Sequence, residues 1–434
     1  MHTKNAVPSL LDPDRSGPRE IHRRSFLKRL AGITVSAATL PWVAEAALPK
    51  AKITRVRIYK PENFNPTFNQ SNMVVTVETD IGLTGVGEGG TKDMLEQCAG
   101  SLIGQDPFRT ELIWHEMYKA WFYPPGREKI HAQGALDLAL WDIKGKALDT
   151  PVHQLLGGMI RNHLECYGTG PLRAPDAAVS PQRMSLRDRA KATIESGFRA
   201  FRLAAGRGNA GDTYNSRQQV RVVAQNCKEV REGVGPDGDW VIDFHQRFDF
   251  DDALRACRLI EEYEPYFVED PVADAQALAQ IPKLRKLTSV PLTHGEEWGQ
   301  RWDFFPLVEN KDIDYIRATL PNVGGITEMV KIAALCQTHA VGICPHFTGP
   351  IATAALVHTL GPFSGPVLVE IGSNTTRPSH IQEGLDFKEG KCWPNQRPGL
   401  GVTLEMNRLA LIGEVSAPGR KLFYYRPDGS LTHW

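Results

Sequence analysis

The stretch VIDFHQRFDF, residues 241 to 250, indicates the fold class of this chain. It begins as an apolar run typical of a buried strand and then places Asp243 and His245 two positions apart. Side chains at positions i and i+2 of a strand share one face. We therefore expect this carboxylate and this imidazole to point into one cavity at the end of the strand.

The same pattern of apolar strand and terminal acid recurs along the chain. Glu269 follows the apolar run in YFVEDP, and Glu296 follows the run in PLTHGEE, so that Asp243, Glu269 and Glu296 stand at nearly equal spacings. From residue 161 to residue 374, short apolar strands alternate with amphipathic helices. The candidate strands lie near Tyr167, Phe201, Ile242, Phe267, Leu292, Ile316, Ile343 and Leu368. Eight strand–helix repeats predict an α/β fold, a (β/α)8 TIM-like barrel with reactive residues at the carboxyl ends of its strands.

The segments on either side of the barrel are expected to form a second domain. Residues 51 to 160 contain the strand TRVRIY, the hairpin MVVTVETDIGLTGVGE and the helical stretch HAQGALDLALWDIKGKALD, whose apolar residues form one stripe. Residues 375 to 434 are rich in proline and have little periodicity. We expect an N-terminal α+β capping domain that is completed by this C-terminal segment.

Residues 1 to 50 are predicted to be an export signal and a linker. They contain a pair of arginines, an apolar stretch from Leu30 to Val43 and a small-residue cleavage site at residues 44 to 46. The motif R-R-S-F-L-K resembles the twin-arginine export signal. The apolar stretch is too short to span a bilayer. We expect a periplasmic protein with no membrane anchor after cleavage.

The composition excludes several classes of partner. The chain has 434 residues, and Lys plus Arg and Asp plus Glu both total 50, so no net field attracts nucleic acid or an anionic membrane. The seven cysteines are scattered without C-x-x-C spacing, which argues against a disulfide framework and a zinc site. We expect a small-molecule ligand and free, mostly buried thiols.

The three acids at strand ends predict a metal site on one rim of the barrel. Crowded carboxylates repel one another and have raised pKa values unless a cation lies among them. Ligands that are all oxygen suit Mg²⁺, whereas zinc prefers nitrogen and sulfur. We therefore expect Asp243, Glu269 and Glu296 to hold one Mg²⁺.

Further polar residues accompany these acids on the same rim. His245 is expected within reach of a metal-bound substrate, where general acid–base work suits it. His346 follows the seventh strand in ICPHF, and Glu370 ends the eighth in VLVEIG. Glu370 has two interpretations, a hydrogen-bond acceptor for the substrate or His346, and a rim salt bridge. We interpret His294 as structural and Glu297 as a rim or loop residue.

Four features of the sequence are shared with a known family. They are VETDIGLTGVGEGG, ALDLALWDIKGKALDTPVHQLLGG, the Asp/Glu/Glu triplet and GGIT after the sixth strand. Together they cover nearly all of residues 53 to 434 and resemble the enolase superfamily, of the mandelate racemase and muconate lactonizing enzyme kind. The resemblance implies Mg²⁺ at the three acids and an enediolate formed by removing the proton next to a carboxylate.

The motifs of the second and third strands indicate which group of enzymes within this superfamily the chain resembles. The Lys-x-Lys of lysine-based racemases and cycloisomerases is replaced by FRLA, which contains Arg202, and DFHQRF is similar to the Asp-x-His of sugar-acid dehydratases. Galactonate dehydratases carry an Asp on the sixth strand, where this chain has Thr319. Mannonate dehydratases fit better, through DYIRATL, RPGLGV, RPDGSLTHW and the spacing of twelve between Arg202 and Tyr214.

The resemblance to mannonate dehydratases implies a role for each residue. Arg202 is expected to lower the pKa of Tyr214, and Tyr214 to remove the C2 proton, with His346 as the alternative base. His245 protonates the departing C3 hydroxyl. Arg317 and His346 orient the substrate, and Glu370 is also assigned to substrate binding.

The expected activity is therefore Mg²⁺-dependent dehydration of a sugar acid to a 2-keto-3-deoxy acid. Thr169 and Pro350 replace a His and an Asp that mannonate enzymes place where the hydroxyl groups of the substrate are expected to bind. The identity of the sugar acid therefore stays open among mannonate-, gluconate- and galactonate-like aldonates. Two alternatives stay open, an epimerase or racemase of sugar or hydroxy acids, and a non-catalytic periplasmic sugar-acid binder. We also expect a homo-oligomer.

Overall fold

The computed structural model describes residues 48–66, 70–120, 126–169, 184–205, 213–372 and 379–432. The predicted export signal, apart from its last three residues, lies outside the described residues. From Leu48 onward the chain forms one compact unit.

Eight short parallel strands form the barrel. They are β4 (Leu164–Thr169), β5 (Ala200–Ala204), β6 (Asp239–Asp243), β7 (Phe267–Glu269), β8 (Leu292–His294), β9 (Tyr315–Ile316), β10 (Gly342–Ile343) and β11 (Val369–Gly372). Each strand from β4 to β10 pairs with the next. The ring closes because β11 pairs with β4 and Ile343 bridges to Val367. The sequence-based prediction of an α/β barrel is confirmed, and all eight expected strands are present.

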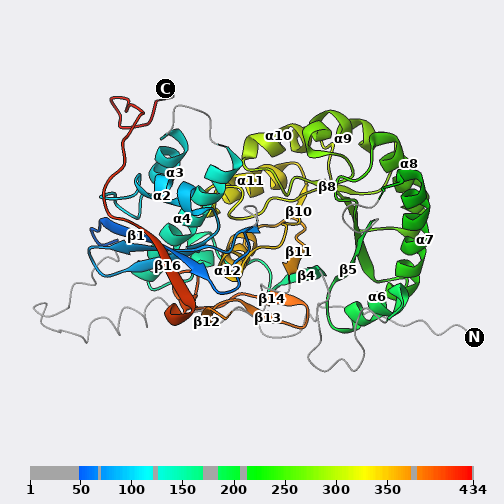
Figure 1. Cartoon of the computed structure of the whole chain (residues 1–434), viewed down its shortest axis with the longest axis horizontal. Coiled ribbons are helices and arrows are strands. Elements are labelled where there is room, and N and C mark those ends of the chain that lie inside the picture. Colours follow the sequence, from blue (N-terminus) through cyan, green and yellow to red (C-terminus); the bar gives the residue numbers. More distant parts are fainter. Residues whose placement is uncertain are drawn as a thin grey trace, which may run out of the picture. The chain divides into compact units, whose positions relative to one another are not determined.

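Within the described residues, seven helices connect the eight strands and lie around the outside of them (Figure 1). They are α6 (Leu186–Glu195), α7 (Ser216–Val234), α8 (Phe250–Ile260), α9 (Ala277–Arg285), α10 (Arg301–Glu309), α11 (Ile326–Thr338) and α12 (Pro350–Leu360). Each helix begins at the rim where the preceding strand ends. That rim therefore collects the ends of all eight strands and the beginnings of these seven helices.

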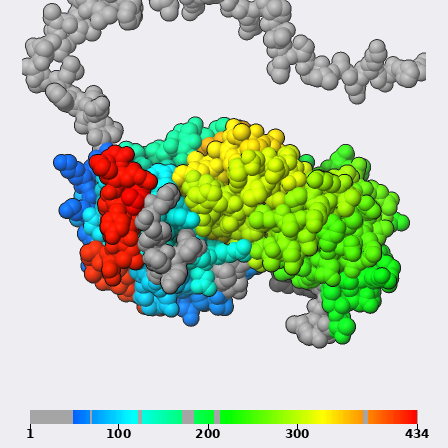
Figure 2. Space-filling model, turned by 90° about the horizontal axis from the view of Figure 1, so that it is seen from above, coloured from blue at the N-terminus to red at the C-terminus, as the bar shows by residue number. Residues whose placement is uncertain are grey.

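The capping domain is built from both ends of the described chain. Its antiparallel sheet has the order β16-β1-β2-β3, with β1 (Ile53–Pro61), β2 (Val74–Thr79), β3 (Thr84–Glu88) and β16 (Leu409–Val415). Its helices are α2 (Lys92–Ala99), α3 (Thr110–Lys119), α4 (Arg127–Ala147) and α5 (Val152–Leu155). Figure 2 shows the red C-terminal residues beside the blue and cyan residues of this domain.

The C-terminal segment also extends the barrel sheet. After β12 (Ile381–Glu383), strands β13 (Asp386–Lys388) and β14 (Lys391–Trp393) form a hairpin whose second strand pairs antiparallel with β4. β15 (Thr403–Leu404) pairs with β12. The segment thus contacts the barrel as well as the capping domain, which the sequence pattern did not indicate.

Helix α4 is buried on nearly all sides, whereas its sequence predicted a single apolar stripe. It packs on β2 and β3 and also contacts α11 and α12 of the barrel. Several of its polar residues are therefore buried, and neighbouring elements satisfy some of them. Asp137 accepts hydrogen bonds from the Thr327 N–H (2.9 Å) and hydroxyl (2.6 Å). The approach to β3 requires glycine, because a Cβ at Gly85 would lie 2.0 Å from the Ala139 carbonyl oxygen.

Two further features of the described residues concern their helices and their cysteines. No helix among the described residues has the length and apolarity that crossing a membrane requires. All seven cysteines are free and buried, as the sequence predicts.

Glu88, at the end of β3, ties the capping domain to the first turn of α12. Its Oε2 accepts hydrogen bonds from the backbone N–H groups of Ile351 (2.8 Å) and Ala352 (2.9 Å), while its Oε1 is buried without a hydrogen-bond partner among the described residues. Burial raises the pKa of Glu88 to about 8, although the two backbone hydrogen bonds act in the opposite direction. The native state therefore binds this proton more tightly than the unfolded chain does.

This burial predicts a pH-dependent stability. Because the folded-state pKa of Glu88 lies above its usual value, the group destabilises the fold increasingly as pH rises from about 4.5 to about 8. Glu88→Gln does not titrate, so its free energy of unfolding relative to wild type should rise by roughly 3–5 kcal/mol over that window. Urea denaturation at pH 5 and pH 8 measures this, with the exposed Glu62→Gln as control. Parallel pH profiles for wild type and Glu88→Gln would contradict it.

Candidate active site

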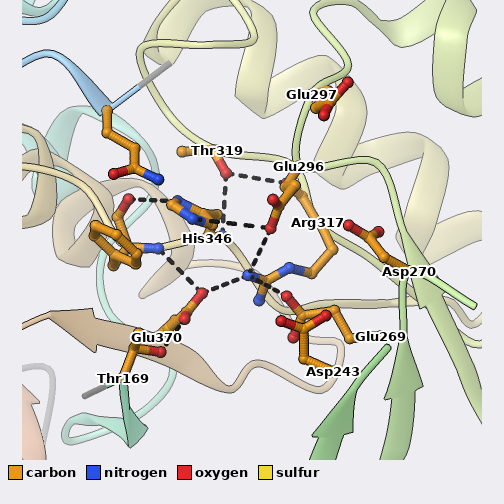
Figure 3. A network of polar contacts seen from close by, with 12 residues as sticks. Thr169, Asp243, Glu269, Asp270, Glu296, Glu297, Arg317, Thr319, His346 and Glu370 are labelled. Atoms are coloured by element: carbon orange, nitrogen blue, oxygen red, sulfur yellow. Dashed lines mark hydrogen bonds and ion pairs between the residues drawn. The ribbon is translucent and has the colours of Figure 1, made fainter. Parts of the chain in front are cut away.

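The three acids that the sequence singled out meet on one rim of the barrel (Figure 3). Asp243 ends β6 and Glu269 ends β7, and the two residues are direct neighbours in the parallel register. Glu296 follows β8 by two residues. All three side chains are buried. Their charges act on one another, since Asp243 raises the pKa values of both Glu269 and Glu296.

Two arginines lie among these carboxylates. Arg317, one residue after β9, is fully buried, and its Nη2 lies 2.9 Å from Glu269 Oε1 and 3.4 Å from Glu296 Oε2. The same nitrogen pairs with Glu370. Arg202, on β5, pairs with Asp243, and its Nε lies 3.7 Å from Glu370 Oε1. Glu370 is thus a salt-bridge partner of both arginines, although it is buried rather than exposed on the rim.

This cluster contains more carboxylates than arginines. Two guanidinium groups face four buried carboxylates, which are those of Asp243, Glu269, Glu296 and Glu370. When all six groups are ionised, two negative charges remain. Burial raises the pKa values of Asp243 and Glu269, and it raises that of Glu296 to about 8, in spite of the arginines. A divalent cation would offset these two negative charges and so favour the ionised form of the acids.

The donors of the cluster fit a hard divalent cation, but Arg317 is among them. Carboxylate oxygens are the ligands that Mg²⁺ prefers. Among the described residues, no three His, Cys, Asp or Glu side chains are already arranged to hold a metal ion. Arg317 Nη2 contacts two of the three expected ligands, so a cation that binds Glu269 and Glu296 must compete with this guanidinium.

His346 follows β10 and is held in one orientation. Its Nδ1 lies 2.7 Å from the Phe347 carbonyl oxygen, so Nδ1 carries the proton and Nε2 has a free lone pair. Nε2 lies 3.8 Å from Glu296 Oε2. Burial lowers the pKa of His346. The nearby charge of Glu370 raises this pKa, and that of Arg317 lowers it further. The buried, neutral imidazole is suited to accept a proton.

Thr319 and Thr169, which replace family residues, both contact this site. Thr319 Oγ1 accepts a hydrogen bond from the His346 backbone N–H (3.1 Å). Thr319 therefore holds the backbone of His346, while the Phe347 carbonyl orients its ring. Thr169, at the end of β4, donates its hydroxyl hydrogen bond to Glu370. Nothing in the sequence indicated the Phe347 contact, since it involves only a backbone carbonyl.

His245 lies in a turn after the strand, and not on the face of the strand where the sequence pattern placed it. Strand β6 ends at Asp243, so the alternation of a strand does not extend to His245. The residue lies in a turn with a left-handed φ of 50°, its backbone N–H donates to Asp243 Oδ1 (2.6 Å), and its side chain is exposed. His245 is therefore accessible from solvent beside the carboxylates.

The expectation that Arg202 lowers the pKa of Tyr214 is wrong. Arg202 is directed into the barrel, where it pairs with Asp243 and Glu370. The side chain of Tyr214 is 40% exposed, and its ring centroid lies 6.4 Å from that of Phe248. Burial raises the pKa of Tyr214, and Arg247 is the cation that opposes this rise. Tyr214 lines a cleft of about 500 Å³ at the beginnings of α7 and α8.

Comparison with known proteins identifies the family. A model of the N-terminal domain of mandelate racemase and muconate lactonizing enzyme matches residues 55–157, and a model of enolase C-terminal-like domains matches residues 185–408. The chain belongs to the enolase superfamily. Enzymes of this superfamily use one or two Mg²⁺ ions to stabilise an ene-diolate.

Relatives of this superfamily member include named dehydratases. D-galactonate dehydratase of Pectobacterium atrosepticum is 33% identical over 401 residues, which cover 88% of this chain and 100% of that protein. D-galactonate dehydratase of Xanthomonas oryzae pv. oryzae is 33% identical over 387 residues, which cover 83% and 96%. A solved enolase superfamily member from Salmonella Typhimurium matches with a TM-score of 0.75 and 26% identity, covering 84% of this chain and 100% of that one. The predicted membership is confirmed.

This enolase superfamily member also has a buried ion pair that the sequence did not predict. Asp270 follows Glu269 directly, and its Oδ1 lies 3.0 Å from Nδ1 of His294 on β8. Burial opposes a charged imidazole, but Asp270 and Asp274 raise the pKa of His294 to about 9. The structural interpretation of His294 understated this role, because the acid that it pairs with belongs to the preceding strand–helix repeat of the sequence.

Proposed function

We propose that this enolase superfamily member dehydrates a sugar acid, an aldonate of the mannonate, gluconate or galactonate kind, to a 2-keto-3-deoxy acid. The observation that carries the proposal is the cluster of four buried carboxylates with only two arginines among them, flanked on one rim by His245 and His346. The D-galactonate dehydratase relatives support the same reaction class.

Asp243, Glu269 and Glu296 are the residues that we assign to one Mg²⁺. When bound, Mg²⁺ polarises the carboxylate of the substrate and offsets the negative charge that develops there as the C2 proton leaves. Arg202 and Arg317 add positive charge at the same place and hold Glu370 in position. Arg317 therefore acts through the carboxylates in this proposal, as well as on an anionic substrate.

We assign the two proton transfers to His346 and His245 from the environment of each side chain. His346 removes the C2 proton, because its Nε2 lone pair is free and its imidazole is neutral. The structure favours it over Tyr214, whose pKa is raised. The C2–H electrons form the C2–C3 double bond, the C3–O bond breaks, and His245 supplies the proton that completes a water molecule. The resulting enol tautomerises to the 2-keto acid.

Export by the twin-arginine route and a homo-oligomeric state are further parts of the proposal. They rest on the paired Arg23 and Arg24 of the sequence and on the family resemblance. A twin-arginine substrate is transported after it has folded, which agrees with seven free, buried cysteines in a protein sent to an oxidising compartment.

Assay of a panel of aldonic acids with Mg²⁺ tests the activity. We expect one or a few stereoisomers to give a 2-keto-3-deoxy acid, detected as its semicarbazone, and no product without a divalent cation. The reaction should be run in D₂O as well. Exchange at C2 without loss of water would favour an epimerase, since His245 and His346 come from different strands of the same rim. Tight binding of an aldonate with no product over long incubation would favour a binding protein.

A further inference from the structure

A second group of polar side chains comes mainly from the same strands and loops as the three carboxylates. Each strand that carries one of those acids contributes to it, and the capping domain contributes one residue. We call this group the outer belt, and it consists of Arg127, Gln246, Asp270, Asp274, His294 and Glu297. Asp270 and Glu297 immediately follow Glu269 and Glu296 in the sequence, so the belt is connected to the site through the backbone.

The barrel residues of the belt form a continuous chain of contacts. His294 lies between two acids, with Nδ1 3.0 Å from Asp270 Oδ1 and Nε2 3.4 Å from Asp274 Oδ1. The Asp274 backbone N–H donates to Gln246 Oε1 (2.7 Å), and Gln246 Nε2 donates to Glu297 Oε1 (3.3 Å). The loops after β6, β7 and β8 are therefore joined to one another by side chains.

Two residues of the belt have a strained backbone conformation, which indicates that the surrounding contacts hold these loops in place. Asp270 and Gln246 have φ values of 44° and 61°, in the left-handed region that non-glycine residues rarely occupy. The Gln246 N–H donates to the Asp270 carbonyl oxygen (3.0 Å), so the two strained residues hold each other. Such conformations persist only where the surrounding contacts over-determine them, and they concentrate at functional sites.

Arg127 connects the belt to the capping domain. It is the first residue of α4. Its guanidinium group contacts two acids of the barrel, with Nη2 2.9 Å from Asp274 Oδ2 and Nη1 3.3 Å from Glu297 Oε2. Asp274 is the junction, since its other carboxylate oxygen faces His294. The side chain of Asp274 is only 16% exposed, so this pair is better shielded than an ordinary surface salt bridge.

We propose that Arg127 and Asp274 couple the docking of the capping domain to the binding of a divalent cation by Glu269 and Glu296. This inference rests on the metal site of the proposed function. Arg127 and Asp274 are positioning residues here, because they act through the loops that carry the two glutamates. Coupling between two sites is reciprocal, so a cation that fixes those loops must also stabilise the beginning of α4 against opening.

Hydrogen exchange of the full-length protein with and without Mg²⁺ tests the coupling. In wild type, saturating Mg²⁺ should slow amide exchange in the first turns of α4 by about fivefold or more, the lower end of typical allosteric couplings. In Arg127→Gln and Asp274→Asn this slowing should disappear. Lys331→Gln is the matched control, because Lys331 on α11 pairs with Glu111 on α3 (2.7 Å), across the same two domains but outside the belt. It should keep the Mg²⁺ effect.

The possible outcomes separate this inference from the proposed function. A purely structural role for Arg127 would speed exchange by the same factor with and without Mg²⁺ and leave the ratio unchanged, which overturns the inference. Mg²⁺ that binds wild type without slowing exchange in α4 also overturns it, while the proposed function stands. Calorimetric titration that detects no Mg²⁺ binding to wild type would overturn the metal site and this inference together.

Discussion

Glu269→Gln is expected to lose Mg²⁺ binding and to lower turnover of the aldonate by about 10³-fold, the scale on which a buried electrostatic group contributes to catalysis. Glu269 is 1% exposed and lies between Asp243, its register neighbour, and Arg317. Glutamine keeps the shape of the side chain but cannot ionise, so it removes one of the four carboxylates of the cluster and weakens one of the three proposed ligands. Calorimetric titration with Mg²⁺ and steady-state kinetics measure the two effects.

The fold should survive this substitution. Burial already raises the pKa of Glu269, so a neutral side chain at this position does not create a new unpaired charge. Thermal unfolding should therefore show a Glu269→Gln variant at least as stable as wild type in the absence of metal. The exposed Glu262→Gln serves as the control for binding and turnover. A Glu269→Gln variant that binds Mg²⁺ as wild type does would exclude this residue from the site.

His245→Asn is expected to lower dehydration by about 10²–10⁴-fold, the usual contribution of a general acid, while leaving Mg²⁺ binding unchanged. The imidazole lies on the solvent side of the rim, and the backbone N–H that bonds to Asp243 remains in the variant. Because His346 still removes the C2 proton, the substrate should exchange deuterium from D₂O at C2 without losing water. Kinetics together with proton nuclear magnetic resonance measure both steps.

A matched variant at the other histidine assigns the two roles. His346→Asn should lose exchange at C2 as well as dehydration, because it removes the base. If His245→Asn dehydrates at the wild-type rate, His245 has no role in the reaction. If His346→Asn still exchanges C2 at the wild-type rate, the base is another group, and Tyr214 becomes the candidate to replace next.

The positions of the acids could be predicted from the sequence because a barrel repeats. Asp243, Glu269 and Glu296 follow one another at nearly equal spacings, one strand and one helix each time, and parallel strands bring such residues to one rim. The same regularity located all eight strands. The hydrophobic pattern of α4 was less informative, because a helix between two domains buries its polar face too.

The partners of long charged side chains could not be predicted in this way. Arg202 was expected beside Tyr214 on the strength of a spacing, yet it pairs with Asp243 on the adjacent strand. Arg317 follows β9 and reaches Glu269, which ends a strand two places earlier in the barrel. Because the arginine side chain is long and flexible, its guanidinium group can reach any of several carboxylates. Only the folded structure shows which of them it contacts. His245 was misplaced for a different reason, since the strand ends sooner than the apolar run suggested.

Anomalous diffraction from a crystal soaked in Mn²⁺, an ion with ligand preferences similar to those of Mg²⁺, tests the central claim most directly. We expect one strong peak per chain, within about 2.0–2.4 Å of a carboxylate oxygen from each of Asp243, Glu269 and Glu296, with Arg317 no longer in contact with the last two. A crystal of active enzyme in which Arg317 still contacts Glu269 and Glu296, and in which the ion lies elsewhere, would contradict the account.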